Sequence, residues 1–456
     1  VGSHTNGSPF SSFLVSSPHA AMGRSETWHA YKHDKEAWVA GQHGTSIVYI
    51  NAICATSLVS YALWLCVRTC RVYTWMPYGW DFSILILPLM LACTVLAHRV
   101  FTLVALILIS AAASAIVRTK TTSQPPSGGH PRSCITVYRA YLMVLTIFCI
   151  LAVDFPIFPR SLAKCETWGT SLMDLGVGSF TFSHGLVSLR TTRSSWSRLG
   201  RRTVPLLLLG AVRILLVKRT EYPEHVSEYG VHWNFFITMG LLLPIIELVQ
   251  RAWPMAPWAL VALCASIMHE SLLMYTPLGP WSISDVRDPT NWVSLNKEGI
   301  TSLPGYVCIA LLGLDVGRMV FTTTRDRRNV HRSLFVRAVA LWALLICLRL
   351  VGLQTSRRMA NMLYVLWCAA FNVSFLLGFM LLGHRQSDAM SATPPLFESI
   401  NRHSLVLFLV SNLATGVVNL LVSTMYASVP ESMTYLFLYM LAMCGLVPAG
   451  LSPAAA

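Results

Sequence analysis

Charged side chains are scarce in this sequence, at 12% of 456 residues, whereas a soluble protein carries about 25%. So little charge cannot cover several water-facing domains, although the length alone would suggest about two or three of them. Apolar residues make up 54% of the chain, which indicates that lipid is its main solvent. We therefore predict a polar N-terminal segment, 1–45, followed by one transmembrane domain, 46–456.

The sequence also lacks the common metal, nucleotide and nucleic-acid motifs. Its 12 cysteines form no CxxC pair and have no zinc-type spacing with histidine, so neither a metal nor a bound cofactor is expected. No Walker or GxSxG motif occurs. The net charge of +14 comes without a basic stripe interleaved with aromatics, so nucleic acid is not an expected partner. Residues 1–45 do not resemble a cleavable signal peptide, and insertion is expected to rely on the first span.

Long apolar runs, in contrast, are abundant. A helix needs roughly 20 apolar residues to cross a bilayer, and about thirteen segments approach that length. Because backbone polar groups in lipid must be satisfied within the segment, these runs predict an all-α polytopic membrane protein. The segments lie near 46–67, 82–98, 100–116, 135–153, 172–190, 203–217, 232–250, 256–276, 304–321, 333–351, 361–383, 403–424 and 434–451.

Among the loops between these segments, some are rich in basic residues and others carry more acidic than basic residues. The loops after the third, fifth and ninth segments are rich in arginine and lysine, whereas loops 218–230 and 277–303 carry more acidic than basic residues. Cytoplasmic loops collect basic residues, and the three basic loops are separated by even numbers of segments. This pattern predicts a lumenal N-terminus and a cytoplasmic C-terminus.

A carboxylate and two cations lie close together in the sequence after the fourth segment. Pro156 and Pro159 stop that helix, so Asp154 is expected at the membrane edge, with Arg160 and Lys164 as its nearest cations. Such a carboxylate can take the proton of an attacking hydroxyl, while Lys164 orients it or stabilises an oxyanion. The alternative is an interfacial ion pair that only fixes the loop, and the spacing alone favours this alternative.

Three further polar residues lie at predicted helix starts. Asp174 fits an N-cap or a first-turn acid, which the helix dipole favours. His232 and Asn234 flank Trp233 at the start of the seventh segment. On chemistry alone, this pair is as consistent with interfacial anchoring as with ligand binding.

Several motifs, taken in order, resemble the GPI inositol acyltransferase family, called PIG-W in animals, where GPI is glycosylphosphatidylinositol. The resemblance covers most of residues 35–425, and the joint order of the motifs is far more specific than any one of them. The motifs are Lys35 to Gly41, Asp154 to Gly178, Glu228 to Phe236, Asn296 to Tyr306, Ser356 to Asn361 and Asn401 to Asn419.

The resemblance implies transfer of a long fatty acyl chain from acyl-CoA to the inositol 2-hydroxyl of glucosaminyl-phosphatidylinositol, at the endoplasmic reticulum membrane. It implies Asp154 as catalytic base and Lys164 as its orienting partner. It makes Arg160, Asp174, His232 and Asn234 candidates for substrate binding. The sequence departs from the family at Ser161, where a second basic residue is common, and this departure puts a phosphate contact in doubt.

Two other functions would also place polar residues in a membrane bundle. A transporter of a lipid or polar solute predicts charges deep inside several spans, whereas most charges here lie at loops and span ends. Membrane acyltransferases of the sterol or protein O-acylating class rely on an intramembrane histidine with an upstream asparagine, and no convincing pair of that kind is found.

Overall fold

The chain divides into two compact units, 1–40 and 41–456, and the account below concerns the second. Most of the predicted polar segment 1–45 and much of the basic loops after the third, fifth and ninth segments lie outside the described residues. The computed structural model describes residues 34–35, 38, 40–68, 73–119, 131–188, 196–219, 226–322, 327–384 and 393–450.

Helices account for nearly all regular structure in the described ranges, where the one extended pairing is an isolated parallel bridge between Gly44 and Thr170. The long helices are α2 (Ile47–Val67), α5 (Val100–Thr119), α6 (Pro131–Ala152), α7 (Leu172–Ser188), α8 (Trp196–Arg219), α10 (Phe235–Ala252), α11 (Trp258–Tyr275), α14 (Lys297–Thr322), α15 (Arg327–Leu350), α16 (Met362–His384), α18 (Ser404–Leu421) and α19 (Val429–Gly450). The short ones are η2 (Tyr73–Trp75), α3 (Pro77–Asp81), η3 (Phe82–Ile86), α4 (Leu87–Ala92), η4 (Ala97–Arg99), η5 (Arg160–Leu162), α9 (Val226–Tyr229), α12 (Leu278–Ile283), α13 (Trp292–Leu295), α17 (Pro395–Arg402) and η7 (Thr424–Tyr426).

Ten helices among the described residues are long and apolar enough to cross a membrane, which confirms the all-α polytopic prediction. They are α2, α5 with η4, α6, α10, α11, α14, α15, α16, α18 and α19. The other three predicted segments are also helical. However, α7 has 17 residues, α8 carries several arginines, and 77–92 is a shorter apolar helix. The count of thirteen spans and the orientation of the termini stay predictions.

The apolar helix 77–92 continues through a π-helical turn, η3. Leu87 donates its backbone N–H to the carbonyl of Phe82, five residues back instead of four. Pro88 follows directly, and its ring would crowd the carbonyl four residues back in a regular α-helix. The wider turn therefore fits the proline. The sequence-based range of 82–98 already contained Pro88, but it began five residues after the observed start of the helix at Pro77, which occupies the first helical position, where a proline is tolerated.

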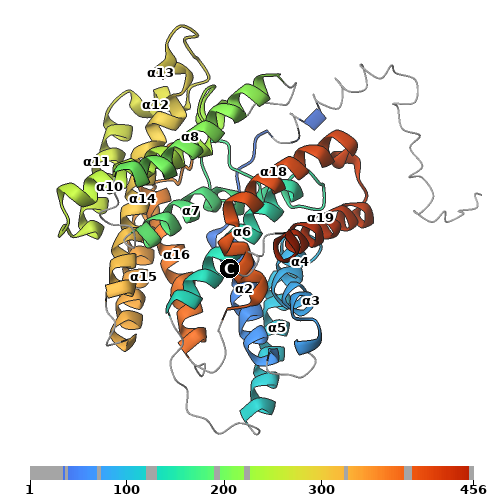
Figure 1. Ribbon diagram of the computed structural model, residues 1–456. Coiled ribbons are helices and arrows are strands. Elements are labelled where there is room, and N and C mark those ends of the chain that lie inside the picture. Colours follow the sequence, from blue (N-terminus) through green and yellow to red (C-terminus); the bar gives the residue numbers. More distant parts are fainter. Residues whose placement is uncertain are drawn as a thin grey trace, which may run out of the picture. The chain divides into compact units, whose positions relative to one another are not determined.

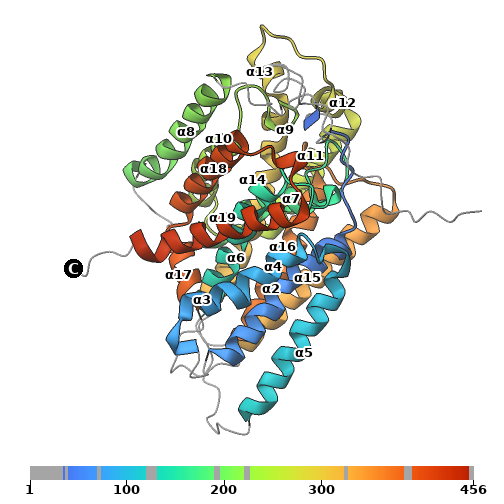
Figure 2. The same cartoon turned by 90° about the vertical axis from the view of Figure 1, so that its right-hand side faces the viewer.

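The core of the second unit lies around α6, α14 and α16 (Figures 1 and 2). In the most apolar windows of α14 and α16, 72% of the residues are buried, against 17% for α5 and α15. Helix α6 packs against α7, α16, α17, α18 and α19. The chain following α6 therefore emerges from the middle of the helix packing.

Helices α7 and α14 approach each other closely through glycines on both sides. A side chain at Gly185 of α7 would overlap a backbone carbonyl of α14, and side chains at Gly313 and Gly317 would overlap carbonyls of α7. Small residues spaced four apart permit this contact between membrane helices. The contact fixes the C-terminal half of α7 against α14.

Connections between helices meet at one end of the bundle, which we call the polar end. The α6–α7 loop (153–171) meets the α15–α16 loop (351–361), because Gly169 N–H donates to the Thr355 carbonyl at 2.8 Å. The α8–α10 connection meets the α11–α14 connection, because Val231 N–H donates to the Leu295 carbonyl at 2.9 Å.

Candidate functional site

The α6–α7 loop is held on two sides. On one side, Thr45 N–H donates to the Thr170 carbonyl at 2.7 Å, beside the bridge from Gly44. On the other, Gly169 bonds to the α15–α16 loop. Gly44 and Gly169 have φ of 78° and 132°, and a side chain at either would overlap a backbone carbonyl. The loop that carries Asp154 and Lys164 is therefore fixed by backbone contacts at its C-terminal part.

Asp154 follows the last turn of α6 and is 7% exposed. Its Oδ2 accepts a hydrogen bond from Asn419 Nδ2 of α18 at 2.8 Å. The Asn419 Oδ1 in turn accepts from the hydroxyl of Thr424 at 3.2 Å. The nearly buried carboxylate of Asp154 thus accepts a hydrogen bond from Asn419, whose amide is oriented by Thr424.

Arg160 starts the short helix η5 in the same loop. Its guanidinium donates to the backbone carbonyl of Val153, next to Asp154. Burial lowers the pKa of Arg160 to about 10, and the nearby Asp154 carboxylate opposes that shift. Arg160 therefore stays positively charged near neutral pH and lies beside Asp154.

Lys164 pairs with Glu228 of α9. Its Nζ lies 2.8 Å from both carboxylate oxygens, and the two side chains are 36% and 20% exposed. The structure therefore pairs Lys164 with Glu228, and places Asn419 and Arg160 at Asp154, in contrast to the predicted Asp154–Lys164 contact. Pro156, Pro159 and η5 separate the two residues along the loop. The catalytic roles of both stay predictions.

Asp174 lies in the first turn of α7 and is fully buried. Its backbone N–H donates to the Ser171 hydroxyl at 3.1 Å, which is an N-cap contact, and that hydroxyl donates to Asp174 Oδ2 at 2.8 Å. Oδ2 also accepts from Cys165 N–H at 3.1 Å. Oδ1 accepts from Arg357 Nε at 2.7 Å. Asp174 thus starts the helix, as its position suggested, and also forms a buried ion pair.

Arg357 connects this ion pair with that of Lys164. Burial alone would lower the pKa of Arg357, but the carboxylates of Glu228 and Asp174 outweigh burial and raise that pKa well above its usual value. The side chains of Lys164, Glu228, Arg357 and Asp174 therefore alternate in charge. They join the α6–α7 loop, α9, the α15–α16 loop and α7.

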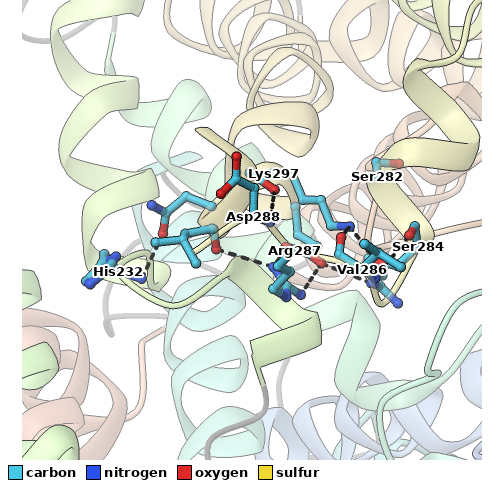
Figure 3. A network of polar contacts seen from close by, with 12 residues as sticks. His232, Ser282, Ser284, Val286, Arg287, Asp288 and Lys297 are labelled. Atoms are coloured by element: carbon cyan, nitrogen blue, oxygen red, sulfur yellow. Dashed lines mark hydrogen bonds and ion pairs between the residues drawn. The ribbon is translucent and has the colours of Figure 1, made fainter. Parts of the chain in front are cut away.

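The next residue, Arg358, belongs to a second network. Glu298 is fully buried and accepts from Arg287 at 2.6 Å and from Arg358 at 2.9 Å. Lys297 donates to backbone carbonyls of the α11–α14 connection, at Ser284 and Val286 (Figure 3). Each buried charge in this network has a polar partner, as burial of ions requires.

His232 and Asn234 lie on the connection between α9 and α10. The His232 N–H donates to Asn296 Oδ1 at 2.7 Å, so His232 lies at the edge of the second network (Figure 3). Asn234 caps α10: its Oδ1 accepts from Phe236 and Ile237 N–H at 3.0 and 3.2 Å. Its Nδ2 donates to a carbonyl of α8. Substrate binding by this pair stays a prediction.

Sequence reasoning did not single out Glu228, Arg357, Arg358 or Glu298, although each lies within a quoted motif. Their signal was available: each is a charged residue in a short loop beside a predicted span, where a charge is a candidate for a functional role. Asn419 appeared only as the last residue of a quoted motif. Its pairing with Asp154 was not predicted.

These features define a polytopic helical membrane protein with two buried charge networks at one end. The family model GWT1 matches residues 31–449. A protein named GPI-anchored wall transfer protein 1 from Aspergillus oryzae is 35% identical over 487 aligned residues, covering 91% of this chain and 97% of the relative. Proteins of the same name from Emericella nidulans and Gibberella zeae are 36% and 33% identical, covering 90% and 92% of the chain and 95% and 97% of the relatives. The chain belongs to the GWT1 family.

Proposed function

We propose that this chain transfers a long fatty acyl group from acyl-CoA to the inositol 2-hydroxyl of glucosaminyl-phosphatidylinositol. The proposal places the chain in GPI-anchor biosynthesis at the endoplasmic reticulum membrane. Family membership over residues 31–449 and the GPI-related names of the relatives support it. The observation that carries it is the position of Asp154. Its carboxylate is 7% exposed, it directly follows a membrane helix, and the same loop holds the two cations Arg160 and Lys164.

In this reaction Asp154 acts as general base. It accepts the proton of the inositol hydroxyl while the hydroxyl oxygen attacks the thioester carbonyl carbon. An ester C–O bond forms and the C–S bond breaks, and the departing CoA sulfur takes up the proton that Asp154 received. Arg160 and Lys164 are the cations of the loop, and they stabilise negative charge on the carbonyl oxygen or on substrate phosphate.

The proposed topology follows from the helix order. Ten spans together with α7, α8 and the helix 77–92 give thirteen crossings, with the N-terminus lumenal and the C-terminus cytoplasmic. The connections at the polar end then share the face opposite the basic loops, which supports a site near the lumenal surface.

The first experiment is acyl transfer from labelled palmitoyl-CoA to glucosaminyl-phosphatidylinositol by the purified full chain. We expect Asp154→Asn to lower kcat by about 100-fold or more, the usual loss on removing a general base. Lys164→Ala is expected to lower kcat as well. Asp288→Asn removes an exposed carboxylate at the same end and serves as the control with unchanged activity.

The outcomes separate the assignments. Full activity of a folded Asp154→Asn variant would refute the base assignment and direct attention to Asp174. A wild-type chain that binds both substrates in detergent but forms no acyl-inositol product would overturn the proposed function and favour lipid or solute transport.

A further inference from the structure

Asp154 is oriented by a hydrogen-bond chain that begins 270 residues later in the sequence, at Thr424. The Thr424 hydroxyl donates to Asn419 Oδ1 at 3.2 Å, and Asn419 Nδ2 donates to Asp154 Oδ2 at 2.8 Å. An amide has distinct donor and acceptor ends. Because its oxygen faces Thr424, the NH₂ group of Asn419 is directed at the carboxylate.

Helix α18 contains a second asparagine, Asn412, whose side chain bonds within its own helix. Asn412 lies seven residues earlier on α18, is exposed, and donates to its own helix at the Phe408 carbonyl at 2.7 Å. An amide on α18 can therefore be satisfied without leaving the helix. Asn419 instead reaches the loop after α6, where its Nδ2 donates to the proposed base.

We propose that Asn419 is the positioning residue for Asp154 and that Thr424 fixes the orientation of the Asn419 amide. This inference rests on the proposed function. The amide donates to one oxygen of the carboxylate and so fixes the plane in which the carboxylate meets the substrate hydroxyl. Without Asn419, the carboxylate loses this hydrogen bond and meets the substrate hydroxyl in fewer productive orientations.

The test compares Asn419→Leu and Thr424→Val with Asn412→Leu as the matched control on the same helix. Asn419→Leu is expected to lower kcat by about 10- to 100-fold, the size of one hydrogen bond to a charged group. The KM for palmitoyl-CoA is expected to change less than about twofold, since binding is not altered. Thr424→Val is expected to give a smaller loss of kcat, and Asn412→Leu none.

A second readout separates positioning from a structural role. Asn419→Asp keeps the size of the side chain but has no amide donor, and it is expected to be as slow as Asn419→Leu. Asn419→Gln keeps the amide donor and is expected to recover part of the lost kcat. If Asn419 only filled space, Asn419→Asp would keep the wild-type kcat.

Unchanged kcat in Asn419→Leu, with an active wild type, would overturn the inference while leaving the proposed function intact. An inactive wild type would instead remove the proposed function. If Asn419→Leu does not fold, Thr424→Val decides: wild-type kcat in that variant would overturn the inference, and a reduced kcat with unchanged KM would support it.

The ion pair between Lys164 and Glu228 supports a second inference, which concerns Lys164. Both oxygens of Glu228 lie 2.8 Å from Lys164 Nζ, and Glu228 also raises the pKa of Arg357. Glu228 thus lies between a half-exposed ammonium and a buried guanidinium. We infer that Glu228 positions Lys164, so that Lys164 acts as a fixed cation near the reacting groups while Asp154 is held separately.

The matched comparison uses two ion pairs of equal length. Glu228→Gln keeps the shape of the side chain but removes its charge, and we expect kcat to fall by about tenfold. Glu228→Asp is expected to recover part of the loss. Glu247→Gln removes a carboxylate that pairs with Arg251 at 2.8 Å on α10, and it is expected to leave kcat unchanged.

The two positioning networks share no residue among the described contacts, so their effects are expected to multiply in the double variant Asn419→Leu/Glu228→Gln. Equal kcat in Glu228→Gln and the wild type would overturn the second inference alone. A double variant no slower than the slower single variant would show that Asp154 and Lys164 are not held separately.

Discussion

Removing either member of the buried Arg357–Asp174 pair is expected to destabilise the protein, and by unequal amounts. The two side chains are 3% and 1% exposed, and breaking a buried pair costs about 3–5 kcal/mol. In Asp174→Asn, Arg357 still lies beside the Glu228 carboxylate. In Arg357→Met, Asp174 stays buried with only neutral donors among its described contacts. We therefore expect about 3 kcal/mol for Asp174→Asn and about 5 kcal/mol for Arg357→Met.

The assay is thermal inactivation of the purified chain in detergent, followed by the fraction that stays monodisperse. Large membrane proteins unfold irreversibly, so the comparison uses half-lives at one temperature. Arg337→Met serves as the control, because Arg337 pairs with Asp315 at 3.0 Å but is 38% exposed. It is expected to cost about 1 kcal/mol or less.

Two results would refute this reasoning. Equal half-lives for Arg357→Met and Arg337→Met would show that burial does not set the cost. A shorter half-life for Asp174→Asn than for Arg357→Met would show that Glu228 does not compensate Arg357. The apolar double variant Arg357→Met/Asp174→Leu is expected to recover much of the loss, since it leaves no charge of the pair behind.

Three further predictions concern single residues. Gly185→Ala is expected to destabilise the α7–α14 contact by about 1–3 kcal/mol, while Gly176→Ala, with open space around it, is expected to be neutral when thermal half-lives are compared. Burial raises the pKa of the Cys165 thiol, so mass spectrometry is expected to find Cys165 alkylated by iodoacetamide at pH 8 only after denaturation; modification of the folded chain would contradict this. Glu298→Gln leaves two arginines without their carboxylate and is expected to reduce the yield of monodisperse protein strongly, whereas Glu398→Gln, on a side chain 57% exposed, is expected to leave it unchanged.

Hydropathy predicted the helices well because spans that face lipid must be apolar on most sides. It was less informative for α7 and α8. Helix α7 is buried against α14 through glycines and is shorter than a typical span, and α8 carries arginines. The second predicted segment, 82–98, also differs from the observed helix 77–92, which starts earlier because Pro77 occupies its first helical position and which passes Pro88 through a π turn.

The position of the site was predicted from ordered motifs, but its contacts were not. Lys164 lies ten residues after Asp154, and this closeness in sequence suggested a pair. The structure instead joins Lys164 to a residue 64 positions away and Asp154 to one 265 positions away. Contacts of that range depend on how helices pack, which single-sequence periodicity does not encode.

The separation of these partners also sets an order of events during synthesis. Arg357 follows Asp174 by 183 residues, and Asn419 follows Asp154 by 265. At roughly 5–20 residues per second, each carboxylate emerges from the ribosome roughly 10–50 s before its partner. The polar end is therefore completed last, and a chain truncated before residue 357 carries two acidic groups at the membrane edge without these partners.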